Sequence, residues 1–237
     1  MGLNRSNKID YDKQFFCRND LHNLDDALSM LKNRAKKFSK FDESIDIEVV
    51  LDVDTNKAEQ KIRSYSLLPY GTGVEHKIAV LYKGVDYDKI SSFSGVYVGF
   101  DDVLDNLKSK KFRSKYAFLV TTPFFLPYLD KVKAILGQSS LYPSIRDGTL
   151  VEDIFSSIYN LTERQVNYKS SLSGVIKCSF GRVSYLEKQL KENAEFLITD
   201  IIKKHPTNIR SFLIKGVRIS TTMGPCVRIS LNSLNIF

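Results

Sequence analysis

The chain has 237 residues, of which 43% are hydrophobic and 26% are charged. This composition is sufficient for buried cores and excludes global disorder. The 35 Lys and Arg residues outnumber the 27 Asp and Glu residues, and the net charge of +8 favours a polyanionic partner. The longest uncharged stretch, residues 116–129, is shorter than the about 20 apolar residues of a membrane helix. We therefore expect no membrane partner.

The basic excess is concentrated in the last third of the chain. Residues 1–70 carry 12 basic and 12 acidic side chains, residues 71–160 carry 11 and 10, and residues 161–237 carry 12 and 5. If the last third packs against a neutral first third, one side of the molecule is basic, which is typical of nucleic-acid-binding proteins. A basic surface that only keeps the protein in solution is an equal alternative.

The first third predicts a helix followed by a strand. Apolar residues recur at helical spacing over residues 24–35. Residues 44–54 alternate between apolar and acidic side chains, which indicates a half-buried strand. The sequence LLPYGTG at residues 67–73 then predicts a domain boundary.

The middle of the chain predicts strands that alternate with helices. The short apolar runs are residues 76–82, 96–100 and 116–122, and the helical patterns are residues 101–110, 126–136 and 151–160. This alternation is typical of a small parallel sheet with both faces covered. A turn-rich segment, residues 137–149, precedes the last of these helices.

The last third predicts a mixture of strands and one long helix. An amphipathic helix covers residues 186–201 and ends before Pro206. Two strands follow, at residues 212–221 and 226–231, joined by a turn around residues 223–225.

No catalytic, metal-binding or cofactor-binding pattern is present in the sequence. His22, His76 and His205 are scattered, without partners at a recognised spacing. Residues 71–73, Gly-Thr-Gly, precede an apolar strand, whereas a phosphate-binding loop leads into a helix. A solvated strand face explains the acidic residues of the first strand better than acid–base chemistry does; they are Asp46, Glu48, Asp52 and Asp54.

The cysteines give no sign of a disulfide or a zinc site. Cys17, Cys178 and Cys226 are odd in number, widely spaced and without a CxxC pair. We therefore expect free thiols in a reducing cytoplasm.

Several blocks of the sequence resemble one family. The hexapeptide STTMGP at residues 220–225 resembles a signature of the L-one family of large-subunit ribosomal proteins. Further blocks resemble that family in the same order: KFDES at 40–44, DTNKAEQKIR at 54–63, LLPYGTG at 67–73 and GVIKCSFGRVSY at 174–185. Order and spacing hold over about residues 22–231.

The resemblance implies an α/β (α+β) fold with two domains. Residues 1–70 and 161–237 would form a discontinuous RNA-binding domain, and residues 71–160 an inserted Rossmann-like, three-layer domain. Two joints between them would act as a hinge. The second joint departs from the family because GQSSLYPSIR at residues 137–146 lacks two of its prolines, so the stiffness of the hinge is the property least safely transferred.

The resemblance also implies a function without enzymatic activity or cofactors. Members bind large-subunit rRNA at the mobile stalk near the tRNA exit site and assist release of deacylated tRNA. Bacterial members repress translation of their own mRNA. We accordingly expect a cytoplasmic protein of the large ribosomal subunit that is monomeric when free, with rRNA, exit-site tRNA and its own operon mRNA as partners. A non-ribosomal RNA-binding homologue and a nucleotide-using enzyme on the middle domain are the alternatives.

The family's contact positions fall on two blocks of this chain and one separate lysine. The resemblance implies that Lys40 neutralises phosphate, Phe41 packs against RNA and Ser44 donates a hydrogen bond. Thr222 would bond to ribose or backbone, Met223 would fill an apolar contact and Gly224 would permit close approach; Thr221 and Lys169 complete the set. Gly216 and Lys177 depart from the family's usual serine and histidine and are left out. The alternatives are a core aromatic at Phe41, a packing residue at Met223 and a strand-face hydroxyl at Ser44.

Overall fold

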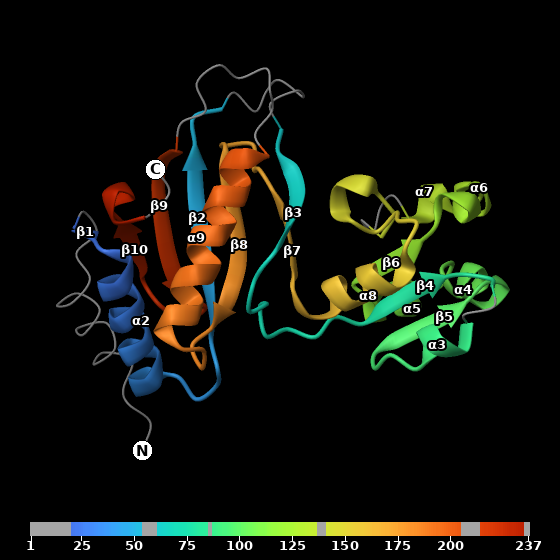
Figure 1. The fold of residues 1–237 in the computed structure, drawn as a ribbon, viewed down its shortest axis with the longest axis horizontal. Coiled ribbons are helices and arrows are strands. Elements are labelled where there is room, and N and C mark those ends of the chain that lie inside the picture. The colour runs from blue at the N-terminus through green and yellow to red at the C-terminus, as the bar shows by residue number, and fades with distance from the viewer. Residues whose placement is uncertain (1–19, 54–60, 85–86, 137–140, 205–213, 235–237) are drawn as a thin grey trace. The chain divides into compact units, whose positions relative to one another are not determined.

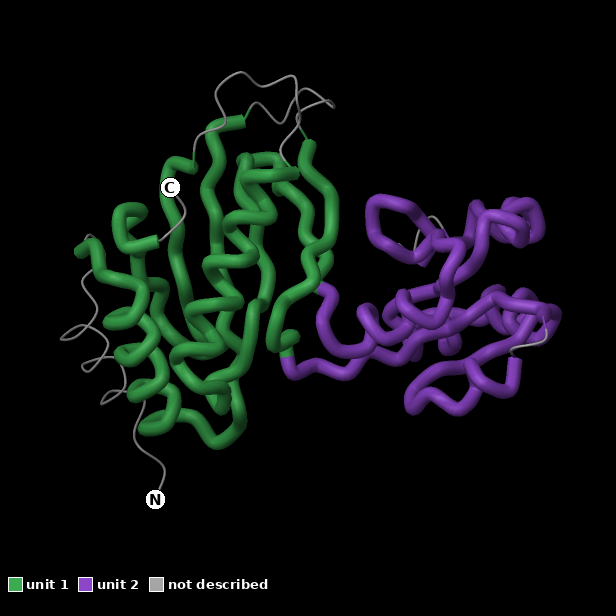
Figure 2. Tube along the Cα trace, in the orientation of Figure 1, with its two compact units in different colours: residues 1–72, 166–237 green, residues 73–165 purple. Residues whose placement is uncertain are grey.

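Two structural units make up the chain (Figure 2). The computed structural model describes residues 20–53, 61–84, 87–136, 141–204 and 214–234. Unit 1 combines residues 1–72 with residues 166–237, and unit 2 is residues 73–165. The fold is mixed α/β, as the sequence predicts. The assignment of domains by function and the hinge between them stay predictions.

Unit 1 is built on a five-stranded sheet in the order β1-β10-β9-β2-β8 (Figure 1). Its strands are β1 (Leu21–His22), β2 (Ser44–Leu51), β8 (Val175–Arg182), β9 (Ile214–Thr221) and β10 (Cys226–Ile229). Neighbouring strands are antiparallel except for β1, which pairs with β10 in parallel. A separate two-stranded sheet contains β3 (Arg63–Leu67) and β7 (Gln165–Lys169).

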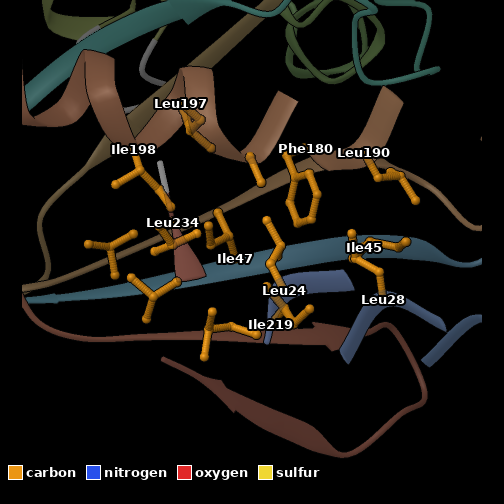
Figure 3. Packing of buried hydrophobic residues seen from close by; sticks show 14 of the residues in the cluster. Leu24, Leu28, Ile45, Ile47, Phe180, Leu190, Leu197, Ile198, Ile219 and Leu234 are labelled. Atoms are coloured by element: carbon orange, nitrogen blue, oxygen red, sulfur yellow. The ribbon is translucent and has the colours of Figure 1, made fainter. Parts of the chain in front are cut away.

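Two helices cover one face of the five-stranded sheet. They are α2 (Leu24–Phe38) and α9 (Glu187–Lys203), and their apolar stripes meet alternate residues of the strands (Figure 3). Along β2 the apolar residues at 45, 47, 49 and 51 are buried, whereas the residues between them are half-exposed. Within the described residues, the other face of the sheet carries these half-exposed side chains, and we call it the open face.

Unit 2 contains a three-stranded parallel sheet in the order β5-β4-β6. Its strands are β4 (Ile78–Leu81), β5 (Val96–Gly99) and β6 (Phe118–Thr121). Its helices are α3 (Tyr87–Ser91), α4 (Asp101–Asn106), α5 (Lys110–Lys115), α6 (Leu126–Asp130), α7 (Lys133–Leu136) and α8 (Ile154–Glu163). Ala79 belongs to one apolar cluster and Val80 to another, because the sheet is covered on both faces. The predicted parallel sheet is confirmed.

The structure differs from the sequence-based elements mainly in the middle unit. The pattern at residues 101–110 predicts one helix, but α4 ends at Asn106 and α5 begins at Lys110. The pattern at residues 126–136 is likewise divided between α6 and α7. Strand β1 has only two residues, too few for a periodic pattern. Several predicted features lie outside the described residues: Cys17, Asp54, His205, Pro206 and residues 137–140.

Candidate nucleic-acid interface

Residues 178 positions apart meet at one end of the five-stranded sheet. β2 begins at Ser44, and β9 ends at Thr221, which pairs with Ile45. The Ser44 amide donates to Thr222 Oγ1 over 3.1 Å, and the Thr222 amide donates to the Ser44 carbonyl over 3.1 Å. The two hydroxyl oxygens lie 2.9 Å apart. We call residues 40–44 together with 221–224 the rim.

A tight turn forms one side of the rim. After β9 the Gly224 amide donates to the Thr221 carbonyl over 2.9 Å, which reverses the chain toward β10. The Met223 amide donates to Glu43 Oε2 over 3.1 Å. The Met223 side chain is 56% exposed, so the interpretation of Met223 as a packing residue is wrong.

The segment before β2 forms the other side of the rim. Phe41 is 56% exposed, and Lys40 is exposed beside it. The Ser39 hydroxyl donates to the Phe41 carbonyl over 3.1 Å and so holds this segment locally. The interpretation of Phe41 as a core aromatic is therefore wrong. The rim presents an aromatic ring, a thioether and a cation to solvent around a pair of hydroxyls.

Two acidic residues of the rim turn toward the protein. Asp42 accepts bonds from the Ser184 amide (3.0 Å) and the Ser184 hydroxyl (2.8 Å). Glu43 is 1% exposed, and its carbonyl accepts from the Val183 amide over 2.9 Å. These contacts attach the start of β2 to the chain that follows β8. The rim is thereby assembled from three segments that are far apart in the sequence.

Gly224 and Thr221 have structural roles in the turn. The Thr221 side chain is buried, and its hydroxyl has no hydrogen-bond partner within the part of the chain that the structure describes. A β-carbon on Gly224 would lie 2.2 Å from Thr221 Oγ1 and 3.4 Å from Arg34 Nη1. Glycine is thus required by the packing beneath the turn. Both residues support the turn in this way, and RNA contact by Thr221 or Gly224 stays a prediction.

Lys169 lies away from the rim. It is exposed at the end of β7, and the next residue, Ser170, bridges to Ile176. Ile176 pairs with Val49, five residues along β2 from Ser44, which corresponds to about 17 Å at the usual rise of a strand. The structure therefore does not bring Lys169 together with the other predicted contact residues, and its role stays a prediction.

The open face beyond the rim carries cations together with carboxylates, and Lys215 pairs with Asp52 over 2.8 Å. Glu48 forms ion pairs with Lys177 (3.3 Å) and Arg218 (3.6 Å). Farther along lies a hollow of about 240 Å³. It is lined by Leu21, Val50, Lys215, Gly216, Val217, Arg218 and Arg228. Three of these seven residues are basic, and a β-carbon on Gly216 would meet no atom within 4 Å.

The titratable groups that could suggest catalysis have structural explanations. His76 packs edge-on against Phe118 at 5.3 Å between ring centroids, and burial lowers its pKa. Burial raises the pKa of Asp46, although a bond from Ser179 acts in the opposite direction. Asp46 is half-buried and Glu48 is paired, so this acidic strand face is less solvated than the sequence predicts. Among the described residues, no cluster of His, Cys, Asp and Glu is arranged for a metal ion, and none of the helices has the length and apolar character to span a bilayer.

Comparisons with known proteins identify the class to which this fold and rim belong. The sequence profile of the Ribosomal protein L1p/L10e family matches residues 31–225, a range that includes both halves of the rim. The Large ribosomal subunit protein uL1 of Buchnera aphidicola subsp. Cinara cedri is 36% identical over 215 residues, covering 90% of this chain and 93% of that protein.

Other bacterial relatives agree. The proteins of the same name from Coxiella burnetii (strain Dugway 5J108-111) and Marinobacter nauticus are each 32% identical, with about nine-tenths of both chains covered. The chain belongs to the Ribosomal protein L1p/L10e family. It is a structural, RNA-binding protein, and the predicted absence of enzymatic activity is confirmed by this membership.

Sequence reasoning did not find every residue that builds the rim. Asp42, Glu43 and Ser184 hold it together, and Arg34 lies beneath Gly224 with 1% of its surface exposed. The one available signal is the acidic pair inside the KFDES block, because two carboxylates are unexpected in a segment that binds a polyanion.

Proposed function

We propose that the protein is a cytoplasmic component of the large ribosomal subunit that binds large-subunit rRNA at the mobile stalk through its rim. The observation that carries the proposal is the rim itself. Two blocks that resemble the family's contact segments lie within hydrogen-bonding distance, with Phe41 and Met223 exposed around them. Membership of the ribosomal family supports the choice of rRNA as the partner.

The chemistry of the rim suits an RNA helix. In A-form RNA the deep major groove hides the base edges, so a protein recognises ribose hydroxyls, phosphates and the shape of the shallow groove. The exposed Thr222 has a hydroxyl that can both donate and accept. Met223 and Phe41 supply apolar surface that can lie against ribose or a base, while Lys40 supplies charge for a phosphate.

The charge of unit 1 supports the same partner. Unit 1 carries 23 basic and 16 acidic side chains, net +7, whereas unit 2 carries 12 and 11, net +1. A positive surface beside the rim lowers the free energy of binding to any polyanion and makes affinity fall with salt. The specificity for one RNA structure would then come from the contacts of the rim.

The finer functions follow from the resemblance. We propose that the protein assists release of deacylated tRNA from the exit site and represses its own mRNA, with the two units acting as hinged domains. Repression would use the rim as well, since an mRNA that mimics the stalk rRNA must fit the same surface. An excess of stalk rRNA fragment should then relieve repression in a cell-free translation reaction programmed with the operon mRNA. Repression that persists would refute the shared surface.

A Thr222→Val substitution tests the rim. It keeps the side-chain shape but removes the hydroxyl beside Ser44, so we expect rRNA binding to weaken by about 1–3 kcal/mol. The measurement is filter binding to a stalk rRNA fragment, after the urea midpoint of each protein has been checked. Thr162→Val is the matched control, because that hydroxyl only donates to the Ile158 carbonyl within α8. Equal affinity of the folded Thr222→Val protein and the wild type would refute the proposal.

Sedimentation separates the ribosomal function from that of a non-ribosomal RNA-binding homologue. A tagged protein should sediment with the large subunit through a sucrose gradient at moderate salt. Recovery only in fractions free of ribosomes would favour the homologue.

A further inference from the structure

Glu43 is an anomaly within a surface proposed to bind RNA. Its side chain is 1% exposed, and Oε2 accepts the Met223 amide over 3.1 Å. Removing a carboxylate from water is costly unless bonds or nearby charge compensate it. A negative charge close to phosphates should also weaken binding of a polyanion. Both the desolvation of Glu43 and its repulsion of phosphate are unfavourable, so we ask which favourable interaction of Glu43 offsets them.

The hydrogen bonds of the turn indicate what that contribution is. The Thr222 amide is held by the Ser44 carbonyl, and the Gly224 amide is held by the Thr221 carbonyl. Between them, the Met223 amide is held by the Glu43 carboxylate. The exposed tip of the turn is therefore attached to the protein through a bond to a charged acceptor, which is stronger than a bond between neutral groups.

The segment that carries Glu43 is itself held to the rest of unit 1. The Glu43 carbonyl is bonded to the Val183 amide, and the adjacent Asp42 is bonded twice to Ser184. Beneath the turn lies the buried guanidinium of Arg34, close to the position that a Gly224 side chain would occupy.

We infer that Glu43 is a positioning residue: its buried carboxylate fixes the Met223 backbone and so presents Thr222 and Met223 in the geometry that recognises ribose. This inference rests on the proposed function. It assigns to an acidic residue a favourable contribution to the binding of a polyanion. The sign of its substitution effect is therefore opposite to the one that charge alone predicts.

Three variants separate positioning from charge. Glu43→Gln removes the charge and keeps nearly the same shape, whereas Glu43→Asp keeps the charge and shortens the reach to Met223. Glu48→Gln is the matched control, because Glu48 lies on the same strand and pairs with Lys177 and Arg218. Removing the Glu48 charge releases Lys177 and Arg218 from their ion pairs. On electrostatic grounds alone, Glu48→Gln should therefore bind RNA more tightly.

We expect both Glu43 variants to bind the stalk rRNA fragment about tenfold more weakly, and Glu48→Gln to bind as well as or better than the wild type. The slope of log affinity against log salt should not change in the Glu43 variants, because no phosphate contact is lost. Their preference for RNA over a fragment with 2′-deoxy positions at the contact should shrink. General destabilisation would not reduce that preference.

Hydrogen exchange tests the same bond without RNA. In the wild-type protein the Met223 amide should be protected about tenfold or more relative to an unstructured peptide. That protection should fall in Glu43→Gln, whose neutral amide oxygen is a weaker acceptor, and be lost in Glu43→Asp, whose carboxylate reaches less far. Glu43→Asp serves if Glu43→Gln does not fold, and the wild-type measurement requires no variant at all. An unprotected Met223 amide in the wild type would overturn the inference.

The outcomes distinguish the inference from the proposed function. If the wild type binds the rRNA and the folded Glu43→Gln protein binds equally or more tightly, the positioning role is refuted and the proposed function stands. If the wild type fails to bind while exchange shows the Met223–Glu43 bond, the proposed function falls and Glu43 is only a structural residue of the turn.

Discussion

The sheets of the two units differ in how many of their faces are buried. In unit 2 the strands of a parallel sheet are buried on both faces: every residue of β4 is buried, and neighbouring residues belong to different apolar clusters. In unit 1 only one face is covered, and β2 alternates between buried and half-exposed residues. Parallel sheets are normally covered twice, whereas antiparallel sheets can leave one face to solvent.

This difference determines how many side chains each sheet leaves accessible to a partner. A strand with both faces buried has no side chains available for a partner, so a binding site can form only at the ends of the strands or on the helices. The open face of unit 1 leaves alternate side chains accessible along whole strands and continues to the rim. The net charge follows the same division, since unit 1 carries +7 of the total +8.

Aspartate substitutions at consecutive positions of one strand should give the largest effects, and they test whether each sheet is covered on one face or on both. Ala79→Asp and Val80→Asp place a charge in either core of unit 2, so each should cost about 3–5 kcal/mol of unfolding free energy. In unit 1, Val49→Asp should cost as much, but Val50→Asp no more than about 1 kcal/mol, because Val50 faces the open side. Urea denaturation followed by circular dichroism measures all four. Equal losses at Val49 and Val50 would mean that the sheet of unit 1 is covered on both faces.

Two glycines of unit 1 sharpen the contrast between the rim and the open face. Gly224→Ala would force its β-carbon against Thr221 Oγ1, so we expect a loss of about 1–3 kcal/mol in stability and weaker rRNA binding. Gly216→Ala enters open space and should change stability by less than about 1 kcal/mol, in the stabilising direction. Thermal unfolding and filter binding compare the two. A neutral Gly224→Ala would show that the turn is not tightly packed.

The salt dependence of binding tests whether the charge asymmetry matters. Arg228 lines the hollow of the open face and is exposed. Arg228→Ala should reduce the slope of log affinity against log salt by about 0.7–0.9 if its guanidinium neutralises one phosphate. Lys131→Ala, on the surface of unit 2, is the control and should leave the slope unchanged. If the slope fell equally in both variants, cations of unit 2 would contribute to RNA binding as much as those of unit 1.

The smallest effect concerns Asp46 on the open face. Burial raises the pKa of Asp46, so the folded protein holds this proton more tightly than the unfolded chain does. Stability is therefore lost as pH rises through the raised pKa. Asp46→Asn lacks this loss, so its stability relative to the wild type should increase as the pH rises through the raised pKa of Asp46. A difference in urea midpoint that does not change with pH would contradict the burial of this carboxyl.

Much of the fold follows from local patterns in the sequence. The predicted helix at residues 24–35 is observed as α2, and the alternation after residue 44 is observed as β2. The predicted boundary at residues 67–73 contains Gly71 and Gly73, whose φ angles are 67° and 71°. Positive φ angles favour glycine because it has no β-carbon. These features depend on neighbours within a few residues. Short elements such as β1 have too few residues for a pattern.

Only part of the candidate site can be predicted from the sequence. The resemblance selected Ser44, Thr222 and Met223, which the structure brings together, and it also selected Lys169, which lies toward the other end of β2. It did not select Glu43: the acidic pair of the KFDES block marks this segment as unusual, but the burial of Glu43 and its bond to Met223 depend on residues 180 positions away.

The amino-acid sequence alone predicts the periodicity of the strands and helices, the position of a Gly/Pro boundary and the concentration of positive charge in the last third. It also carries the ordered blocks of a ribosomal family. Three features become visible only in the folded chain: residue 44 meets residue 222, Phe41 and Met223 face solvent, and the buried Glu43 holds the Met223 amide. The physical reason is that periodicity is a property of neighbouring residues. The rim depends on the pairing register of strands that are distant in the chain, and burial of a whole face fixes that register.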